Sequence, residues 1–232
     1  MLELKIDHIG TNGDGIAYQD GQTYYVPFTA PGDSITAEKK EKRGNGFTAD
    51  LIEIVSPSPD RIEAKCRHFG TCGGCSLQHM SDPFIADWKQ KRIQEALKRV
   101  GLEEIEIAAT VTSSPASRRR VEFVAAKRKK GVMVGYHMRR SHQIFDVGDC
   151  PLLLPQLMSV VKPLRGMLPS VMARNSQVRL TLTATANGPD LLITGDIQVD
   201  LNVREILAEF GFSEAEIDSL LDSNTVLKSR QR

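Results

Sequence analysis

The sequence predicts an α+β protein: a small N-terminal β-barrel of the oligonucleotide-binding (OB) type, followed by a mixed α+β domain with a cysteine-ligated cluster. Short alternating segments separated by glycine-rich turns predict the barrel, and a later mixture of strands and helices predicts the second domain. The length of 232 residues fits one or two domains. We expect the boundaries at residues 1–56 and 62–200, with a helical tail at 201–232.

The barrel strands are predicted from the period of two that a half-buried strand shows. Residues 2–6 alternate apolar and polar, and 16–18 and 24–28 follow after turns rich in glycine and aspartate. Residues 34–42 and 47–55 form a predicted hairpin around Gly44-Asn45-Gly46. This pattern alone leaves open a generic β-barrel without a ligand.

A proline-containing linker at residues 56–60 precedes the cysteine segment, after which the sequence predicts a helix. Ser81 and Asp82 are candidate N-caps, Pro83 suits the first turn, and Gly101 ends the element. One face of the helix is apolar at spacings i, i+3, i+4 and i+7 (Ile93, Ala96, Leu97, Val100). The remaining surface is basic (Lys89, Lys91, Arg92, Lys98, Arg99).

Strands return after residue 118 and alternate with helices. Residues 119–126, 132–138 and 143–147 have strand character, and 178–182 should pair with 191–193 across a turn at Asn187-Gly188. Residues 152–168 are expected to be helical in two pieces. Two further helices are expected at 203–210 and from the capping box Ser213–Glu216 to residue 221.

The net charge of +1 is an average over three unlike parts. Residues 1–60 carry 5 basic and 10 acidic side chains, residues 61–150 carry 17 and 10, and residues 151–232 carry 8 and 9. The basic excess therefore lies in the middle third, together with all four cysteines. The N-terminus lacks the pattern of a secretory signal and no apolar run is long enough to span a membrane, so we expect a soluble, cytoplasmic protein with reduced thiols.

The four cysteines form the most specific pattern in the chain. Three of them, Cys66, Cys72 and Cys75, have the spacing C-x5-C-x2-C, and Cys150-Pro151 follows far downstream. Four thiolates suit a tetrahedral zinc ion or a 4Fe–4S cluster. Structural zinc usually uses two close pairs of ligands, so three clustered cysteines and one remote cysteine followed by proline favour iron–sulfur, with zinc as the alternative. The neighbouring His68 and His79 are not needed as ligands.

A basic stretch between residues 115 and 143 indicates contact with nucleic acid, because arginine forks bind phosphate. It contains only one acid, Glu122. Aromatic side chains alternate with the charges, and we expect them to face the core rather than to stack on bases. The candidate RNA-binding residues are Arg118, Arg119, Arg120, Lys127, Arg128, Lys129, Lys130, Arg139 and Arg140.

These motifs together resemble the N-terminal portion of the bacterial RNA (uracil-5-)-methyltransferases, which methylate ribosomal and transfer RNA. The most specific matching text is CRHFGTCGGCSLQH at residues 66–79, supported by VPFTAPG at 26–32 and by Asp149-Cys150-Pro151. The resemblance covers roughly residues 1–200. It implies an RNA-binding barrel called a TRAM domain at about 1–55, and a central domain that holds a 4Fe–4S cluster through Cys66, Cys72, Cys75 and Cys150.

The departures from that family are equally informative. The family binds its methyl donor, S-adenosylmethionine, in a Rossmann-like C-terminal domain that also supplies a nucleophilic cysteine and a carboxylate base. This chain has no glycine-rich nucleotide loop and no cysteine beyond Cys150. We therefore expect an RNA-binding portion that is inactive alone, does not bind S-adenosylmethionine, and has a separate methyltransferase domain or chain as a partner.

Two rival interpretations remain at this point. One is a non-catalytic RNA-binding module or assembly partner with a structural zinc site. The other rests on residues 205–227, which resemble the C-terminal tail of CaiB/BaiF-type CoA-transferases, although the rest of such an enzyme is missing.

Overall fold

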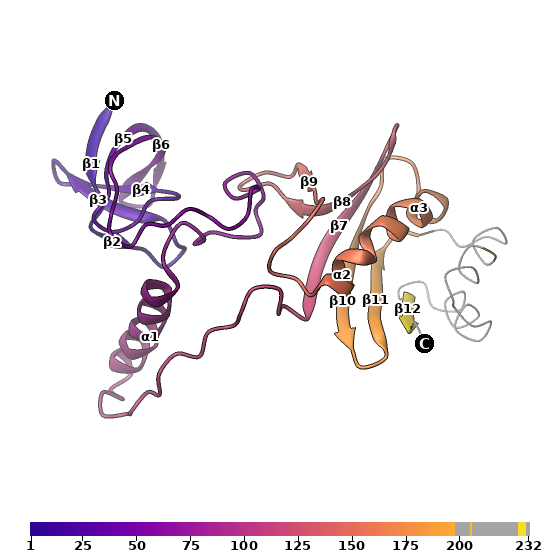
Figure 1. Cartoon of the computed structure of the whole chain (residues 1–232). Helices are drawn as coiled ribbons and strands as arrows, with labels where there is room; N and C mark the ends of the chain where they lie inside the picture. The colour runs from indigo at the N-terminus through magenta and orange to yellow at the C-terminus, as the bar shows by residue number, and fades with distance from the viewer. Residues whose placement is uncertain (198–204, 206–226, 231–232) are drawn as a thin grey trace. The chain divides into compact units, whose positions relative to one another are not determined.

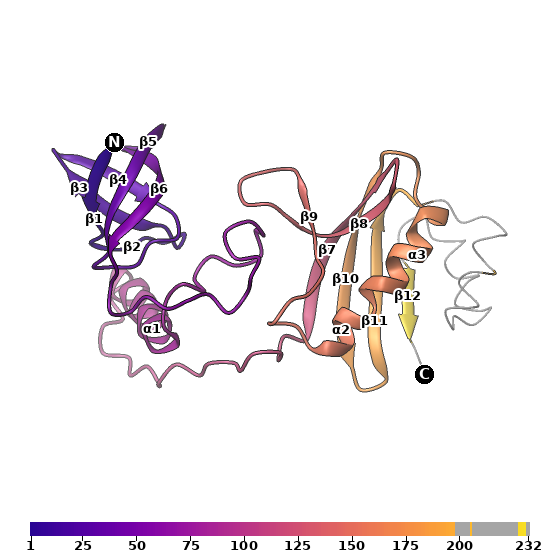
Figure 2. The same ribbon diagram turned by 45° about the horizontal axis from the view of Figure 1, so that its top comes forward.

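The computed structural model describes residues 1–197, 205 and 227–230. It divides the chain into two compact units, the first built from residues 1–70 and 75–113 and the second from residues 71–74 and 114–232. Figures 1 and 2 show a β-rich fold with few helices in two orientations. The predicted central domain at 62–200 is thus shared between both units. The helices predicted at 203–210 and 213–221 lie outside the described residues, apart from Glu205.

The first unit contains a curled six-stranded sheet in the order β1-β5-β6-β4-β3-β2 (Figure 2). Its strands are β1 (Leu2–Lys5), β2 (His8–Ile9), β3 (Gly15–Gln19), β4 (Gln22–Val26), β5 (Ser34–Arg43) and β6 (Gly46–Ser56). All pairs are antiparallel except β4 with β6. The predicted 34–55 hairpin is confirmed. The inward residues enclose one small core (Leu4, Ile6, Ala17, Tyr24, Val26, Ile35, Ala37, Ala49).

A buried carboxylate fixes the chain segment that leaves this sheet. Asp33 is fully buried, and its Oδ atoms accept hydrogen bonds from the backbone N–H groups of Ala30 (2.6 Å) and Ser58 (2.8 Å). The Arg61 guanidinium completes the set with Nη2–Oδ2 at 2.5 Å and Nε–Oδ1 at 3.1 Å. The proline-containing segment 56–60, predicted to be a linker, is therefore held against the sheet, with Ser58 buried.

Helix α1 (Asp82–Arg99) begins where the sequence predicts. The Ser81 Oγ accepts a hydrogen bond from the Phe84 N–H at 3.3 Å, Pro83 lies in the first turn, and Gly101 follows the end with φ +77°. The predicted apolar face does not form part of a core: no residue of α1 is buried, and Ile93 and Val100 are 53% and 68% exposed. Phe84, Ile85 and Trp88, in the N-terminal half of the helix, are the α1 residues that pack against a core of the first unit.

The second unit is a fully antiparallel six-stranded sheet in the order β12-β11-β10-β7-β8-β9. Its strands are β7 (Arg120–Arg128), β8 (Gly131–His137), β9 (Ile144–Asp146), β10 (Gln177–Thr185), β11 (Gly188–Gly195) and β12 (Leu227–Arg230). Strand β12 was not predicted from the sequence.

Two short helices, α2 (Pro155–Ser159) and α3 (Val161–Val171), lie against one face of this sheet, as Figure 1 shows. This confirms the prediction of helix in two pieces. Apolar side chains of the helices and of strands β7, β8, β10 and β11 form the larger core, centred on Phe123, Leu157, Leu168 and Leu180. Within the described residues, no helix combines the length and apolar character needed to cross a membrane.

We predict that Asp33→Asn lowers the free energy of unfolding by about 3–5 kcal/mol, because it leaves the Arg61 charge without its buried partner. The matched control is Asp50→Asn on an exposed carboxylate 3.8 Å from Lys40, which should cost less than about 1 kcal/mol. Urea unfolding followed by circular dichroism measures both. Equal effects of the two substitutions would contradict the role given to Asp33.

The same contact should make stability depend on pH in the acid range. Burial alone would raise the pKa of Asp33, but the hydrogen bonds from Arg61, Ala30 and Ser58 hold this pKa below its ordinary value. A group with a lowered folded-state pKa stabilises the protein above its ordinary pKa of about 4, and this contribution is lost as the pH falls through the lowered value. The Asp33→Asn variant should lack this part of the acid dependence.

Candidate nucleic-acid interface and cysteine segment

The cysteine segment begins and ends at one isolated bridge in the first unit. Arg61 pairs with Met80 across this bridge, and the Ile62 N–H donates to the His79 carbonyl at 3.0 Å, so residues 62–79 form a closed loop. Cys66 and Cys75 both lie on it and are half-buried. The Cys66 N–H donates to the Gln78 side-chain oxygen at 3.1 Å, which ties the first cysteine to the end of the segment.

The tip of that segment, residues 71–74, belongs to the second unit and packs on β8. Cys72 forms an isolated bridge with Met138, and the Gly73 N–H donates to the His137 carbonyl at 3.0 Å. A Cβ atom on Gly73 would lie 2.4 Å from that carbonyl oxygen, so only glycine fits at this position. Glycine between two cysteines also frees the backbone to bring their thiols together, so the close approach to β8 is a second reason for glycine at this position.

All four cysteines are half-buried. Cys150 packs against the core of the second unit. Among the described residues, no three His, Cys, Asp or Glu side chains lie together in a way that could hold a metal ion. The set Cys66, Cys72, Cys75 and Cys150 therefore stays a prediction from spacing.

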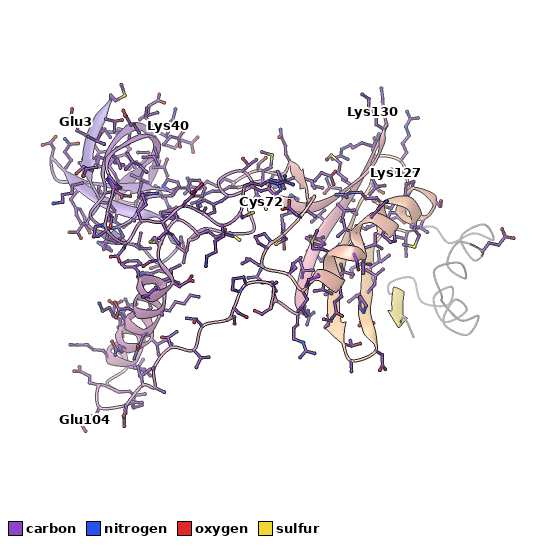
Figure 3. All side chains as sticks on the ribbon, in the orientation of Figure 1. Glu3, Lys40, Cys72, Glu104, Lys127 and Lys130 are labelled. Atoms are coloured by element: carbon purple, nitrogen blue, oxygen red, sulfur yellow. The ribbon has the colours of Figure 1, made fainter. Side chains whose placement is uncertain are left out.

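The predicted basic stretch is divided between the two ends of β7. Arg118, Arg119 and Arg120 are exposed at its start, and Arg128, Lys129 and Lys130 are exposed at the turn into β8. At about 3.3 Å per residue, the two groups are roughly 30 Å apart. Figure 3 shows Lys130 at the outer tip of the β7–β8 hairpin. Four of these side chains form no ion pair with an acid in the described part of the chain: Arg118, Arg120, Lys129 and Lys130.

Lys127 differs from the other candidate residues because its ammonium group is used within the second unit. The Lys127 Nζ donates to the carbonyl oxygens of Pro169 (2.6 Å) and Met172 (2.7 Å) at the C-terminal end of α3. A cation is favourable there because the last carbonyls of a helix lack partners. Arg139 and Arg140, the remaining candidates, form the turn after β8, with Arg140 at φ +51°.

The aromatic residues of the basic stretch face the core, as we expected for them. Phe123 is fully buried, and Tyr136 meets it edge-on with ring centroids 5.0 Å apart. Phe123 belongs to the core of the second unit, and the half-buried Tyr136 packs against the same core.

Sequence reasoning missed an aromatic cluster in the first unit. Phe69 stacks on His79 with centroids 5.5 Å apart and meets Phe28 edge-on at 5.1 Å. His79 is buried and its Nε2 lies 3.1 Å from the Thr29 carbonyl oxygen, which agrees with a hydrogen-bonding rather than a ligand role. Phe28 has φ +63°, a strained value for a bulky residue that nothing in the sequence signals.

Two basic side chains on strand β5 of the curled sheet form ion pairs with acidic side chains. Lys40 Nζ lies 2.6 Å from Glu38 Oε2, and this hydrogen bond lowers the pKa of Glu38 and raises that of Lys40. Arg43 pairs at 2.8 Å with Asp14, whose side chain is almost fully buried. These two basic side chains of β5 are thus engaged with acids.

The chain thus combines a curled six-stranded sheet with a second sheet that carries exposed arginines and lysines, and known proteins with similar sequences show the class to which it is related. Residues 2–59 match the family model described as tRNA (uracil(54)-C(5))-methyltransferase, TRAM domain. An RNA methyltransferase of Caulobacter vibrioides is 39% identical over 200 residues, covering 84% of this chain and 46% of the relative. A 23S rRNA (uracil(1939)-C(5))-methyltransferase of Halomonas elongata is 33% identical over 82% of this chain and 40% of its own length.

The fold agrees with these relatives. The crystal structure of Pyrococcus abyssi tRNA (uracil-54, C5)-methyltransferase in complex with S-adenosyl-L-homocysteine superimposes with a TM-score of 0.62 at 21% identity, over 90% of this chain and 49% of that chain. The chain is thus related to the RNA (uracil-C5)-methyltransferases, and its first unit begins with their TRAM domain. It spans about half the length of the curated relatives that it matches.

We predict that Lys127→Ala destabilises the protein by about 1.5–3 kcal/mol, since it removes two charge-assisted hydrogen bonds to the end of α3. Its RNA affinity should match that of the unchanged protein. Lys130→Ala, at the exposed tip of the same hairpin, should change stability by less than about 0.5 kcal/mol. Thermal unfolding and RNA filter binding separate the two effects. A Lys127→Ala variant with normal stability and weakened RNA binding would contradict this assignment.

Proposed function

We propose that this chain is the RNA-binding portion of an RNA (uracil-C5)-methyltransferase, acting on ribosomal or transfer RNA. The TRAM-domain match over residues 2–59 carries the proposal. The identities of 33–39% to RNA methyltransferases over more than four fifths of the chain support it. Methyl transfer and S-adenosylmethionine binding are assigned to the part of the relatives that has no counterpart here.

The exposed arginines at the start of β7 are the best candidates for RNA contact. Arg118, Arg119 and Arg120 are adjacent and exposed, and the Arg119 side chain donates from Nη2 to the Ala184 carbonyl at 3.5 Å. A guanidinium group can donate two parallel hydrogen bonds to a phosphate. Three such groups on one strand end can follow consecutive phosphates of an RNA strand. We propose that they form the main electrostatic contact.

Replacing Arg118, Arg119 and Arg120 together with alanine should weaken RNA binding and flatten its salt dependence. Each lost phosphate contact removes about 0.7 from the slope of log K against log salt for a single strand, so the triple variant should lose roughly 2. Fluorescence anisotropy with a labelled uridine-containing RNA over a salt series measures this slope.

The matched control removes the same charge from the other end of β7, as Arg128→Ala, Lys129→Ala and Lys130→Ala in one chain. If RNA contacts the start of β7, the control keeps most of the slope. Equal losses in both variants would show attraction by net charge alone, and an unchanged slope in the first variant would exclude Arg118–Arg120 as the RNA surface.

We further propose that Cys66, Cys72, Cys75 and Cys150 hold a 4Fe–4S cluster. The support is the C-x5-C-x2-C spacing with a remote Cys-Pro, together with the half-buried position of all four cysteines. Thiolates are the ligands that such clusters require, so the chemistry of the donor set fits. When bound, the cluster would supply cross-links between distant parts of the chain, and we assign it no step in methyl transfer.

Anaerobic purification should then give a brown protein with broad visible absorption and about four iron and four sulfide per chain. Replacing any one of the four cysteines with serine should abolish the colour, whereas Ser76→Ala, beside Cys75, should leave it unchanged. A colourless protein containing one zinc ion per chain would establish the zinc alternative instead. Metal-free protein of normal stability would exclude both.

A further inference from the structure

The side chain of Gln78, near the end of the cysteine segment, is bonded to one of the proposed cluster ligands. Its Oε1 atom accepts a hydrogen bond from the Cys66 backbone N–H at 3.1 Å. This contact identifies the two ends of the carboxamide, because the opposite orientation would place an N–H group against another N–H group. The nitrogen end of the amide is therefore the end that does not face the Cys66 backbone.

That nitrogen is buried and lacks a hydrogen-bond acceptor in the described part of the chain. The Gln78 Nε2 atom is shielded from solvent, and none of the described protein groups accepts a hydrogen bond from it. An amide nitrogen carries two N–H donors, and leaving a buried donor unpaired destabilises the folded chain. Buried side-chain donors nearly always have a partner, which can be a protein group, an ordered water or a bound group. The amide therefore indicates an acceptor other than the described protein groups.

The residues on either side of Gln78 are held by the first unit. Leu77 packs against an apolar cluster of that unit, and a Cβ atom on Gly13 would lie 3.0 Å from its Cδ2. The Nε2 atom of His79 lies 3.1 Å from the Thr29 carbonyl oxygen. Turning the Gln78 amide out to water would also break its hydrogen bond to the Cys66 backbone. Its position is thus fixed from both sides.

The chemistry of Cys66 indicates the missing acceptor. A neutral thiol accepts hydrogen bonds weakly, whereas the thiolates and sulfides of an iron–sulfur cluster carry negative charge and accept N–H groups well. Hydrogen bonds to these sulfurs are among the factors that set the reduction potential of a cluster. A buried amide donor that is held at a cluster ligand fits this sulfur chemistry.

We propose that Gln78 is a positioning residue for the 4Fe–4S cluster. Its Oε1 atom holds the Cys66 backbone, and its Nε2 atom donates a hydrogen bond to a sulfur of the bound cluster. This hydrogen bond stabilises the reduced cluster most, because reduction adds negative charge to the sulfurs. Gln78 thus raises the reduction potential. The inference rests on the proposed cluster and does not depend on the RNA contact at β7.

The direct test is pulsed electron paramagnetic resonance of the full chain after one-electron reduction of its cluster. The protein is labelled with a nitrogen isotope at the side-chain amides of its glutamines. We expect coupling of the cluster to one labelled amide nitrogen, and Gln78→Leu should remove this signal. No coupled nitrogen in the unchanged chain would overturn the proposal and assign the amide to a buried water. A signal that survives Gln78→Leu would overturn it as well.

The second measurement is the reduction potential, from an anaerobic titration followed by visible absorption. At a fixed applied potential, Gln78→Leu should lower the ratio of reduced to oxidised cluster about tenfold, which corresponds to 59 mV for one electron. The matched control is Gln22→Leu, the same substitution at an exposed glutamine at the start of β4, and it should leave the potential unchanged. An unchanged potential in Gln78→Leu, or an equal shift in the control, would contradict the role given to Gln78.

Iron analysis of each variant separates loss of the hydrogen bond from loss of the cluster. If Gln78→Leu does not assemble a cluster, Gln78→Met takes its place, since it keeps the unbranched side chain and lacks the donor. A chain that contains zinc or no metal would overturn this proposal together with the cluster. Loss of RNA binding in every variant, with the nitrogen coupling intact, would instead count against the RNA-binding role and leave the Gln78 contact in place.

Discussion

The buried carboxylate of Asp33 decides how the first unit continues beyond its strands. Two backbone N–H groups and one guanidinium group donate hydrogen bonds to it. One of the N–H groups belongs to Ser58, in the proline-containing segment 56–60 that the sequence predicts to be a linker. Arg61, the guanidinium donor, also starts the closed loop that contains Cys66 and Cys75 through its bridge to Met80. The ion pair thus fixes the point where the cysteine segment leaves the TRAM domain.

Charge is separated between the two parts of the molecule, and this limits what each can do toward RNA. Residues 1–60, which include the TRAM domain, carry 10 acids and 5 bases, and the basic side chains Lys40 and Arg43 are engaged with carboxylates. A polyanion approaching this surface gains little from simple attraction. The exposed Arg118, Arg119 and Arg120 at the start of β7 have no such partners among the described residues, which supports the proposal that they contact RNA.

Local patterns in the sequence were sufficient for most of the fold, whereas tertiary placement was not. Alternation, turn residues and the Ser81 cap depend on neighbours in the chain, and the structure confirms the hairpin 34–55 and the start of α1. The residues of the basic stretch are close in sequence, which predicts one continuous surface. Strand β7 instead separates them into two groups, one at each of its ends. The partners of the Lys127 ammonium group, the carbonyls of Pro169 and Met172, are more than forty residues away in the sequence, so local pattern could not predict them. Helical periodicity does not show which elements pack against a helix, so it could not predict that α1 has no buried residue.

Gly73 shows how one residue can satisfy two demands at once. Between two cysteines, glycine frees the backbone to bring thiols together, and this much follows from the spacing. The structure adds that the His137 carbonyl fills the space of its missing side chain, so the tip of the cysteine segment lies directly on the end of β8. The next residues, Arg139 and Arg140, form the turn into β9. The position of the Cys72 thiol and that of a basic turn are therefore set by one backbone contact, and any ligand that fixes the thiol also restrains the turn.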